Sequence, residues 1–387
     1  IFHKSLQLLF LAVITQQNKV RNYCLPSFFY SFACYTYFMK ILIAPDISQI
    51  NNSFLLADRL IHLIQNSGHE CVISAPKDFE FSCTRYNAPY PRCHFFYEIG
   101  KSYEEWLFNT GRLDKRYLRK DISALSECIS KENPDLILDL NRTAAPIVAR
   151  IHHIPFYSFV STANYRDKQF HKDVLAPLNS FLTENNLEQV LHVYDLYQFA
   201  NKRIGFSQSS VQLFLETANV ERYLVPLPEE TTLKAPNVSI YFLHTEFPYK
   251  NLIKIITDSF LHAPYAVQAC IIDTPKEQLD NITFLPYPDL SAISRTNVVI
   301  HDGDSYLYHV CLTLGIPQVI INTGEPEQIY ECAVTKRCGF GLTINEDELS
   351  VASLYEAYRR VTANSYYKDR AELYRKDINQ LKPLDIF

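Results

Sequence analysis

The sequence predicts an α/β protein of two halves, each with a mostly parallel sheet, that face one another across a cleft. From residue 39 onward, short apolar runs alternate with longer amphipathic stretches, as strands and helices do in this class. The runs are apolar at successive positions, which is typical of strands buried on both faces of a parallel sheet. The alternation pauses at the proline-framed polar segment 226–236 and then starts again. A chain of 387 residues also has room for two or three domains, at roughly 150 residues each.

The elements of the first half follow from apolar spacing and from residues that end helices. Leu56, Leu60 and Ile64 recur at helical spacing, and Gly68 stands where a helix C-terminus favours glycine. We expect a strand at 41–44, a helix ending near 67, strands at 71–74 and 134–139, a helix at 144–151 and a strand at 154–159.

The second half repeats the same alternation. We expect a strand at 238–243, a helix at 252–261, strands at 267–272, 282–285 and 298–300, a helix at 306–314, a strand at 319–321, and helices at 325–336 and 347–362. There is no internal repeat in the sequence.

Composition and missing motifs exclude several classes of function. A net charge of −5 argues against nucleic acid or an anionic membrane as the main partner. The ten cysteines include no C-x-x-C pair, which indicates reduced thiols and a cytoplasmic location. No two ligand pairs stand at zinc spacing, so we expect no metal site. A G-x-G-x-x-G loop and a Walker P-loop are both absent, which excludes Rossmann dehydrogenases and P-loop NTPases.

The first 38 residues differ from the rest of the chain. They contain basic residues and no acid, and the only methionine of the chain, Met39, opens the first expected strand. We therefore expect 1–38 to be a non-native or disordered leader outside the fold, produced by upstream translation. The alternative is a membrane-associating leader. Its apolar patches fall short of the ~20 residues that span a bilayer, so no transmembrane segment is expected.

A strand-to-helix turn at 301–305 is the best candidate for ligand binding. The expected strand ends at Ile300, Gly303 permits a tight turn, and a helix begins directly afterwards. Such a turn presents backbone N–H groups and the positive end of a helix dipole at the edge of the sheet, where phosphate binds. A ligand of two α/β domains lies in the crevice between them.

The segment 282–342 carries a family resemblance. His301, Gly303, Gly315-Ile316-Pro317-Gln318, Gln328, Gly339 and Gly341 stand in order at spacing similar to the pattern V-V-H-H-G-G-x-x-[ST], G-[VI]-P-Q, D-Q and G-x-G. This resembles the UDP-glycosyltransferase superfamily with the GT-B fold, especially its bacterial members that modify small lipophilic acceptors. The resemblance extends over nearly all of 39–380 and is strong over about 282–342.

The resemblance implies a division of labour between two Rossmann-like domains. It implies an acceptor-binding domain at 39–228, a linker at 229–236, a nucleotide-sugar-binding domain at 237–375 and a C-terminal tail at 376–387. The donor-binding residues implied are His301, Asp302, Gly303, Asp304, Ser305, Glu327 and Gln328, and the acceptor-binding ones are Asn51, Asn52 and Ser53. The implied co-substrate is a UDP- or dTDP-linked sugar, with no further cofactor and no metal.

Departures of three kinds from the family pattern affect the expected chemistry. Asp302 and Asp304 stand where the family has a histidine and a glycine, and like charges ~4 Å apart cost about 1 kcal/mol in water and several times more near a protein surface. Glu327 replaces an aspartate. The third departure is the catalytic histidine, which is missing from the loop 46–53.

The aspartate that orients this histidine in the family resembles Asp139, at the end of the strand 134–138. Either Asp46 or Asp139 is then the catalytic base. The alternative is that Asp139 only caps the helix that begins near Ala144.

Three functions follow, in order of preference. The first is an inverting glycosyltransferase of the hexosyltransferase type, acting on a hydroxyl acceptor. The second is an inactive homologue that serves as a partner subunit or small-molecule binder, which the missing histidine and the two aspartates favour. The third is a sugar-nucleotide epimerase, for which the sequence offers no good acid/base set.

Overall fold

The computed structural model describes residues 38–46, 53–77, 79–91, 102–159, 172–206, 220–230, 236–243, 247–271 and 274–386. All of them belong to one unit that starts at Phe38. The expected leader therefore lies outside the described residues, apart from Phe38. So do 231–235 of the expected linker.

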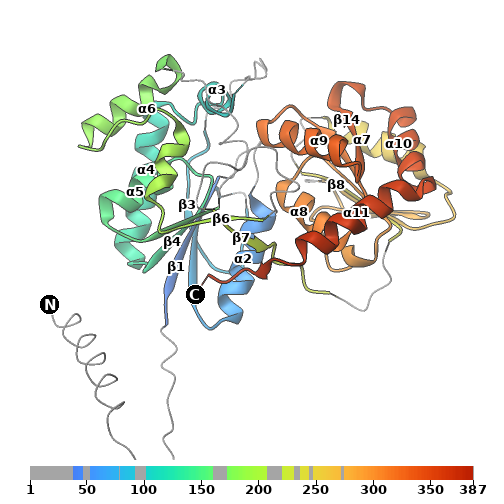
Figure 1. Cartoon of the computed structure of the whole chain (residues 1–387), viewed down its shortest axis with the longest axis horizontal. Helices are drawn as coiled ribbons and strands as arrows, with labels where there is room; N and C mark the ends of the chain where they lie inside the picture. Colours follow the sequence, from blue (N-terminus) through green and yellow to red (C-terminus); the bar gives the residue numbers. More distant parts are fainter. Residues whose placement is uncertain are drawn as a thin grey trace, which may run out of the picture. The chain divides into compact units, whose positions relative to one another are not determined.

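Two separate sheets organise the described residues, and the prediction of an α/β fold with two mostly parallel sheets is confirmed (Figure 1). The first has the order β15-β7-β6-β5-β4-β1-β2-β3, and its strands pair in parallel. Its strands are β1 (Lys40–Pro45), β2 (Glu70–Ala75), β3 (Thr84–Asn87), β4 (Leu136–Leu140), β5 (Phe156–Phe159), β6 (Lys202–Gly205), β7 (Glu221–Leu224) and β15 (Lys382–Pro383).

The second sheet has the order β10-β11-β9-β8-β12-β13-β14, and only the β10–β11 pair is antiparallel. Its strands are β8 (Val238–Phe242), β9 (Val267–Ile271), β10 (Glu277–Leu279), β11 (Ile282–Leu285), β12 (Val298–His301), β13 (Gln318–Asn322) and β14 (Gly341–Asn345).

The helices that cover the sheets begin and end at residues suited to those positions. Asp114 accepts hydrogen bonds from the first N–H groups of α4, and Gly315 ends α8 with a left-handed φ of 70°. The helices of the first half are α2 (Phe54–Asn66), α3 (Tyr103–Asn109), α4 (Lys115–Glu132), α5 (Ala144–His152) and α6 (Lys172–Glu184). Those that follow β8 are α7 (Tyr249–Phe260), α8 (Ser305–Leu314), α9 (Pro326–Cys338), α10 (Val351–Ala363) and α11 (Ser365–Ile378).

Strand β1 shows why its sequence is apolar at every position. Ile41 and Ile43 belong to one buried cluster, whereas Leu42 and Ala44 belong to another. Because successive side chains of a strand point to opposite faces, both faces of the first sheet are buried at β1.

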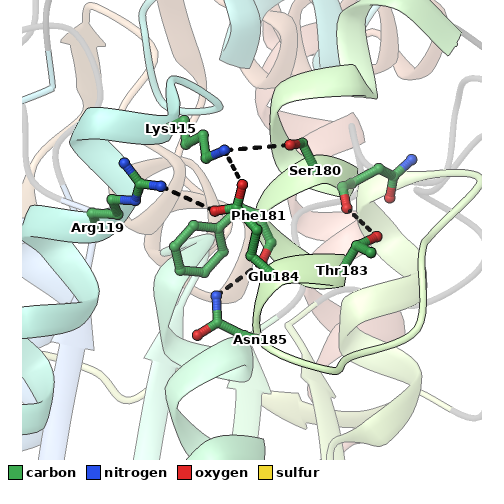
Figure 2. A network of polar contacts seen from close by, with 8 residues as sticks. Lys115, Arg119, Ser180, Phe181, Thr183, Glu184 and Asn185 are labelled. Carbon is green, nitrogen blue, oxygen red and sulfur yellow. Dashed lines mark hydrogen bonds and ion pairs between the residues drawn. The ribbon is translucent and has the colours of Figure 1, made fainter.

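Polar contacts fix α6 against α4 in the first half (Figure 2). Glu184 accepts hydrogen bonds from Lys115 and from Arg119, the latter at 3.0 Å. Asn185 donates to the carbonyl of Phe181 at 2.9 Å and so closes the end of the helix. The charged groups are partly exposed, so these ion pairs add little to the stability and mainly set the position of the helix.

Contacts also connect the second sheet's helices with the first sheet. The hydroxyl of Tyr306 in α8 donates to the carbonyl of Pro226 at 2.7 Å. On the same helix, the ring of His309 packs edge-on against the ring of Phe206, with 5.9 Å between the ring centroids. The end of the chain returns to the first sheet, since β15 pairs with β7.

None of the helices in the described ranges is both long enough and apolar enough to cross a membrane.

Candidate functional site

Acidic side chains gather where the central strands of the first sheet end. Asp46 directly follows β1, and its N–H donates to the carbonyl of Leu140 in β4 at 3.0 Å. Asp139 lies in β4 and is paired in register with Ala44 of β1 and Ser158 of β5. The two carboxylates named by the sequence therefore occupy neighbouring strands at one edge.

Asp46 forms a buried ion pair with Arg112. The Nε atom of Arg112 lies 2.7 Å from Oδ2 of Asp46, and the two side chains are 2% and 4% exposed. The guanidinium also lies over the ring of Trp106, 4.4 Å from its centroid. Burial raises the pKa of Asp46, and the positive charge of Arg112 opposes that rise. Arg112 therefore fixes the carboxylate of Asp46 in place, and the ring of Trp106 helps to hold the guanidinium.

Asp139 is fully buried and accepts two hydrogen bonds. Its Oδ2 accepts from the hydroxyl of Ser158 at 2.6 Å, and its Oδ1 accepts from the N–H of Arg142 at 2.9 Å. Burial raises the pKa of Asp139 to about 7, although both hydrogen bonds act in the opposite direction. Arg142 lies before Thr143, the N-cap residue of α5, so the bond from its N–H to Asp139 comes from outside the helix and is not a helix cap.

Arg142, whose N–H binds Asp139, also belongs to a second buried ion pair. Arg142 pairs with Asp121 of α4 and donates from Nη1 to the carbonyl of Ser74 in β2 at 2.7 Å. The guanidinium thereby ties β2, α4 and the start of α5 together.

Tyr103 is a buried tyrosine at the start of α3. Its side chain is 5% exposed, and its hydroxyl has no hydrogen-bond partner within the described ranges. Burial raises the pKa of Tyr103 well above its usual value, and the next causes are the negative charges of Asp46 and Glu327.

Sequence reasoning did not find Tyr103 or Arg112. One signal was available for the helix that carries the tyrosine: Ser102 and Glu105 form a capping box at the start of α3. The same helix contains the only tryptophan of the chain, Trp106. No local pattern indicates that Arg112 pairs with a residue 66 positions earlier.

In the second sheet, the turn after β12 packs against α9. Gly303 has a φ of +79°, and a Cβ atom at this position would lie 2.4 Å from Cγ of Gln328. Glycine is therefore required both by the backbone and by the close approach of Gln328. Two parts of the expected donor site, the turn 301–305 and Gln328, are in contact.

The polar side chains of this turn are bound within the protein. The Nε2 atom of His301 lies 2.8 Å from Oε1 of Gln318, with both residues fully buried. Asp304 caps α8 by accepting the N–H of Leu307 at 2.8 Å. A carboxylate thus occupies part of the helix N-terminus at which a phosphate was expected. Ser305 is the first residue of α8, and Asp302 is buried beside it.

The start of α9 adds further carboxylates. Gln328 is buried. Its Oε1 accepts two hydrogen bonds from Thr323, one from the N–H at 3.0 Å and one from the hydroxyl. Burial raises the pKa of Glu331 well above its usual value, and the charge of Glu327 adds to this effect. Glu327, partly exposed, is therefore the side chain of this group that is best placed to meet a ligand.

Of the expected acceptor residues, Asn51 and Asn52 lie outside the described residues. Ser53 precedes α2 but makes no capping hydrogen bond with its side chain. Over the described ranges, no group of three or more metal-ligating side chains comes together.

No protein-family model matches the sequence, and no curated protein matches it either. Solved structures do match over most of the chain. The glycosyltransferase SsfS6 from Streptomyces sp. SF2575, complexed with thymidine diphosphate, matches with a TM-score of 0.65 at 16% identity, covering 89% of this chain and 97% of that one. The chain has the GT-B glycosyltransferase fold.

Two further GT-B structures show the same extent of likeness. The rhamnosyltransferase SpnG, complexed with spinosyn aglycone, has a TM-score of 0.67 at 14% identity and is covered over 97% of its length. The calicheamicin glycosyltransferase CalG4 has a TM-score of 0.63 at 17% identity and is covered over 95%. Each covers 89% of this chain, so the GT-B likeness includes both sheets rather than one.

Proposed function

We propose that this protein is a glycosyltransferase that moves a hexosyl group from a nucleoside diphosphate sugar to a hydroxyl acceptor with inversion. The observation that carries the proposal is the buried pair of Asp46 and Arg112 at the edge of the first sheet. Two GT-B relatives in fold hold thymidine diphosphate and an aglycone respectively, which are the two kinds of ligand that such a reaction needs.

Asp46 is the proposed general base. The acceptor oxygen attacks the anomeric carbon, the bond from that carbon to the diphosphate breaks, and the acceptor's proton passes to the carboxylate. Attack opposite the leaving group inverts the anomeric centre. A raised pKa suits this role, and Arg112 orients the carboxylate. General-base catalysis contributes typically ~10²–10⁴-fold to the rate.

Asp139 is the proposed positioning residue. Both of its oxygens accept hydrogen bonds from Ser158 and Arg142, and its side chain is fully buried. It therefore acts on the reaction through the strand ends that it holds together.

The proposed donor site lies at the turn 301–305 and the start of α9. Glu327 accepts hydrogen bonds from sugar hydroxyls, and Gln328 holds the loop around Thr323 in place. The donor is UDP- or dTDP-linked and needs no resident cofactor, because its diphosphate is already a leaving group. Asp302 and Asp304 weaken the binding of that diphosphate. Nucleotide sugars and reduced thiols both suit a cytoplasmic protein.

The second candidate is an inactive homologue that binds a small molecule or an active partner subunit. The carboxylate of Asp304 at the N-terminus of α8 favours it, since that carboxylate competes with a bound phosphate.

Calorimetric titration with UDP, dTDP and their glucose conjugates separates the two candidates. A transferase binds a sugar nucleotide, and Glu327→Ala weakens that binding more than the binding of the free diphosphate. Asp347→Ala, on an exposed 3₁₀ turn, is the matched control and leaves both affinities unchanged. Absence of binding to every nucleotide would contradict the transferase and leave the second candidate.

A further inference from the structure

Two cysteines face one another at the edge of the first sheet. Cys71 is the second residue of β2, and Cys83 directly precedes β3. The parallel pairing of the strands brings Val72 opposite Thr84, so the residues before them, Cys71 and Cys83, are neighbours across the strands. Adjacent strands lie roughly 4.8 Å apart, within the 4.4–6.8 Å that separates the Cα atoms of a disulfide.

The two side chains also point to the same face. Cys71 belongs to a buried cluster that includes Ile73, two residues along the same strand, and Cys83 packs against that cluster. The interaction of the two neighbouring thiols lowers the pKa of Cys71 and raises that of Cys83. Cys71 is nearly buried, whereas Cys83 is partly exposed. A small oxidant can therefore reach the pair through Cys83.

Other cysteines lack these features. Burial raises the pKa of Cys128 and Cys332 to about 12, which disfavours their reactive thiolate. Within the described part of the chain, Cys71 is the one cysteine whose pKa is lowered.

We propose that Cys71 and Cys83 form a redox modification site that closes into a reversible disulfide when it meets a disulfide oxidant such as oxidised glutathione. One thiolate of the pair attacks a sulfur of the oxidant and releases one reduced glutathione. The other thiolate attacks the resulting mixed disulfide and releases the second. Two protein thiols and one oxidised glutathione become one protein disulfide and two reduced glutathiones.

The bond ties the segment 72–82 into a loop. Phe81 in this segment packs against Phe54, the first residue of α2, with 5.2 Å between their ring centroids. Oxidation therefore restrains the chain beside the proposed acceptor side of the first sheet, and it restricts the unfolded chain as any cross-link does.

Peptide mapping of the full-length protein tests the proposal. The protein is incubated with oxidised glutathione, remaining thiols are alkylated, and trypsin is added without reduction. Cleavage after Lys77 separates the two cysteines, so the disulfide is detected as peptide 60–77 joined to 78–85. The intact protein loses two hydrogen atoms, melts a few degrees higher, and returns to its starting mass and melting temperature with dithiothreitol.

Cys83→Ser should abolish the joined peptides, and the matched variant Cys93→Ser should keep them. The proposal is overturned if both peptides carry only the alkylating label after oxidation. It is equally overturned by a stable glutathione adduct on Cys83, or by a link from either cysteine to the peptide 93–101. Mapping of the wild-type protein decides the matter even if a variant fails to fold.

Discussion

Asp139→Asn should remove a specific pH dependence from the stability of the protein. Burial raises the pKa of Asp139 to about 7 from an ordinary value of 3.8, so the native state holds a proton that the unfolded state releases. The contribution of Asp139 to the free energy of unfolding is therefore greatest at a pH below its pKa in the unfolded state. The contribution is lost as the pH rises through its pKa in the native state. A difference of about three pKa units corresponds to roughly 4 kcal/mol between pH 4 and pH 8.

The asparagine variant is a suitable probe because its amide oxygen still accepts the N–H of Arg142. Urea unfolding is followed by the fluorescence of Trp106, the only tryptophan, at intervals from pH 4 to pH 8. Wild-type stability minus variant stability should fall by roughly 4 kcal/mol over this range. Other titrating groups cancel in the difference.

Ser158→Ala provides the control for this measurement. Removing the hydroxyl takes away a hydrogen bond that lowers the pKa of Asp139, so the fall should move to higher pH. A difference that stays constant from pH 4 to pH 8 would refute the assignment of a raised pKa to this buried carboxyl.

Three further predictions concern single side chains. Arg112→Met should destabilise the protein by about 3–5 kcal/mol, because the carboxylate of Asp46 stays buried after losing the cation that it is bonded to. Arg119→Met, in a partly exposed pair, should cost much less in the same urea assay. Gly303→Ala should lower the melting temperature more than Gly68→Ala. Both glycines have a left-handed φ, but only at position 303 would the new Cβ atom clash, with the side chain of Gln328; equal losses would contradict the role of this clash. Tyr103→Phe removes a buried hydroxyl that has no partner among the described residues, so it should leave the stability unchanged or higher; a loss of stability would contradict this.

The sheets were predictable because buried strands are visible in the sequence. Every residue of the strands β8 and β12 is buried, and all of them except Ser239 and His301 are apolar, as is typical of a parallel sheet covered on both faces. The strands β3, β6, β7, β10, β14 and β15 were not predicted, and β15 shows why a short strand escapes sequence analysis. It consists of Lys382 and Pro383, which carry no strand pattern, and it exists because the chain end reaches β7.

The candidate site was predictable only where a residue follows directly from a strand or a helix. Asp46 and Asp139 stand at strand ends, and Asp304 occupies the position before a helix that favours aspartate as a cap. The role of Arg112 was not predictable, because its partner, Asp46, lies 66 residues away in the sequence and the two meet only through tertiary packing. The contact of His301 with Gln318 was not predictable either: the register pairs His301 with Ile320, and its side chain reaches Gln318 two residues away on the same face of the sheet.

Formation of a glycosylated product by wild-type protein and by Asp46→Asn tests the central claim most directly. Each protein is given UDP-glucose or dTDP-glucose with a panel of hydroxyl acceptors, and product is quantified by mass spectrometry. Asp114→Asn, which changes an exposed helix cap, is the control. We predict product with the wild-type and control proteins, and a rate for Asp46→Asn that is lower by about 10²–10⁴-fold with donor affinity retained. Equal rates for all three proteins would contradict the assignment of Asp46, and no product from any protein that still binds the donor would contradict the transferase itself.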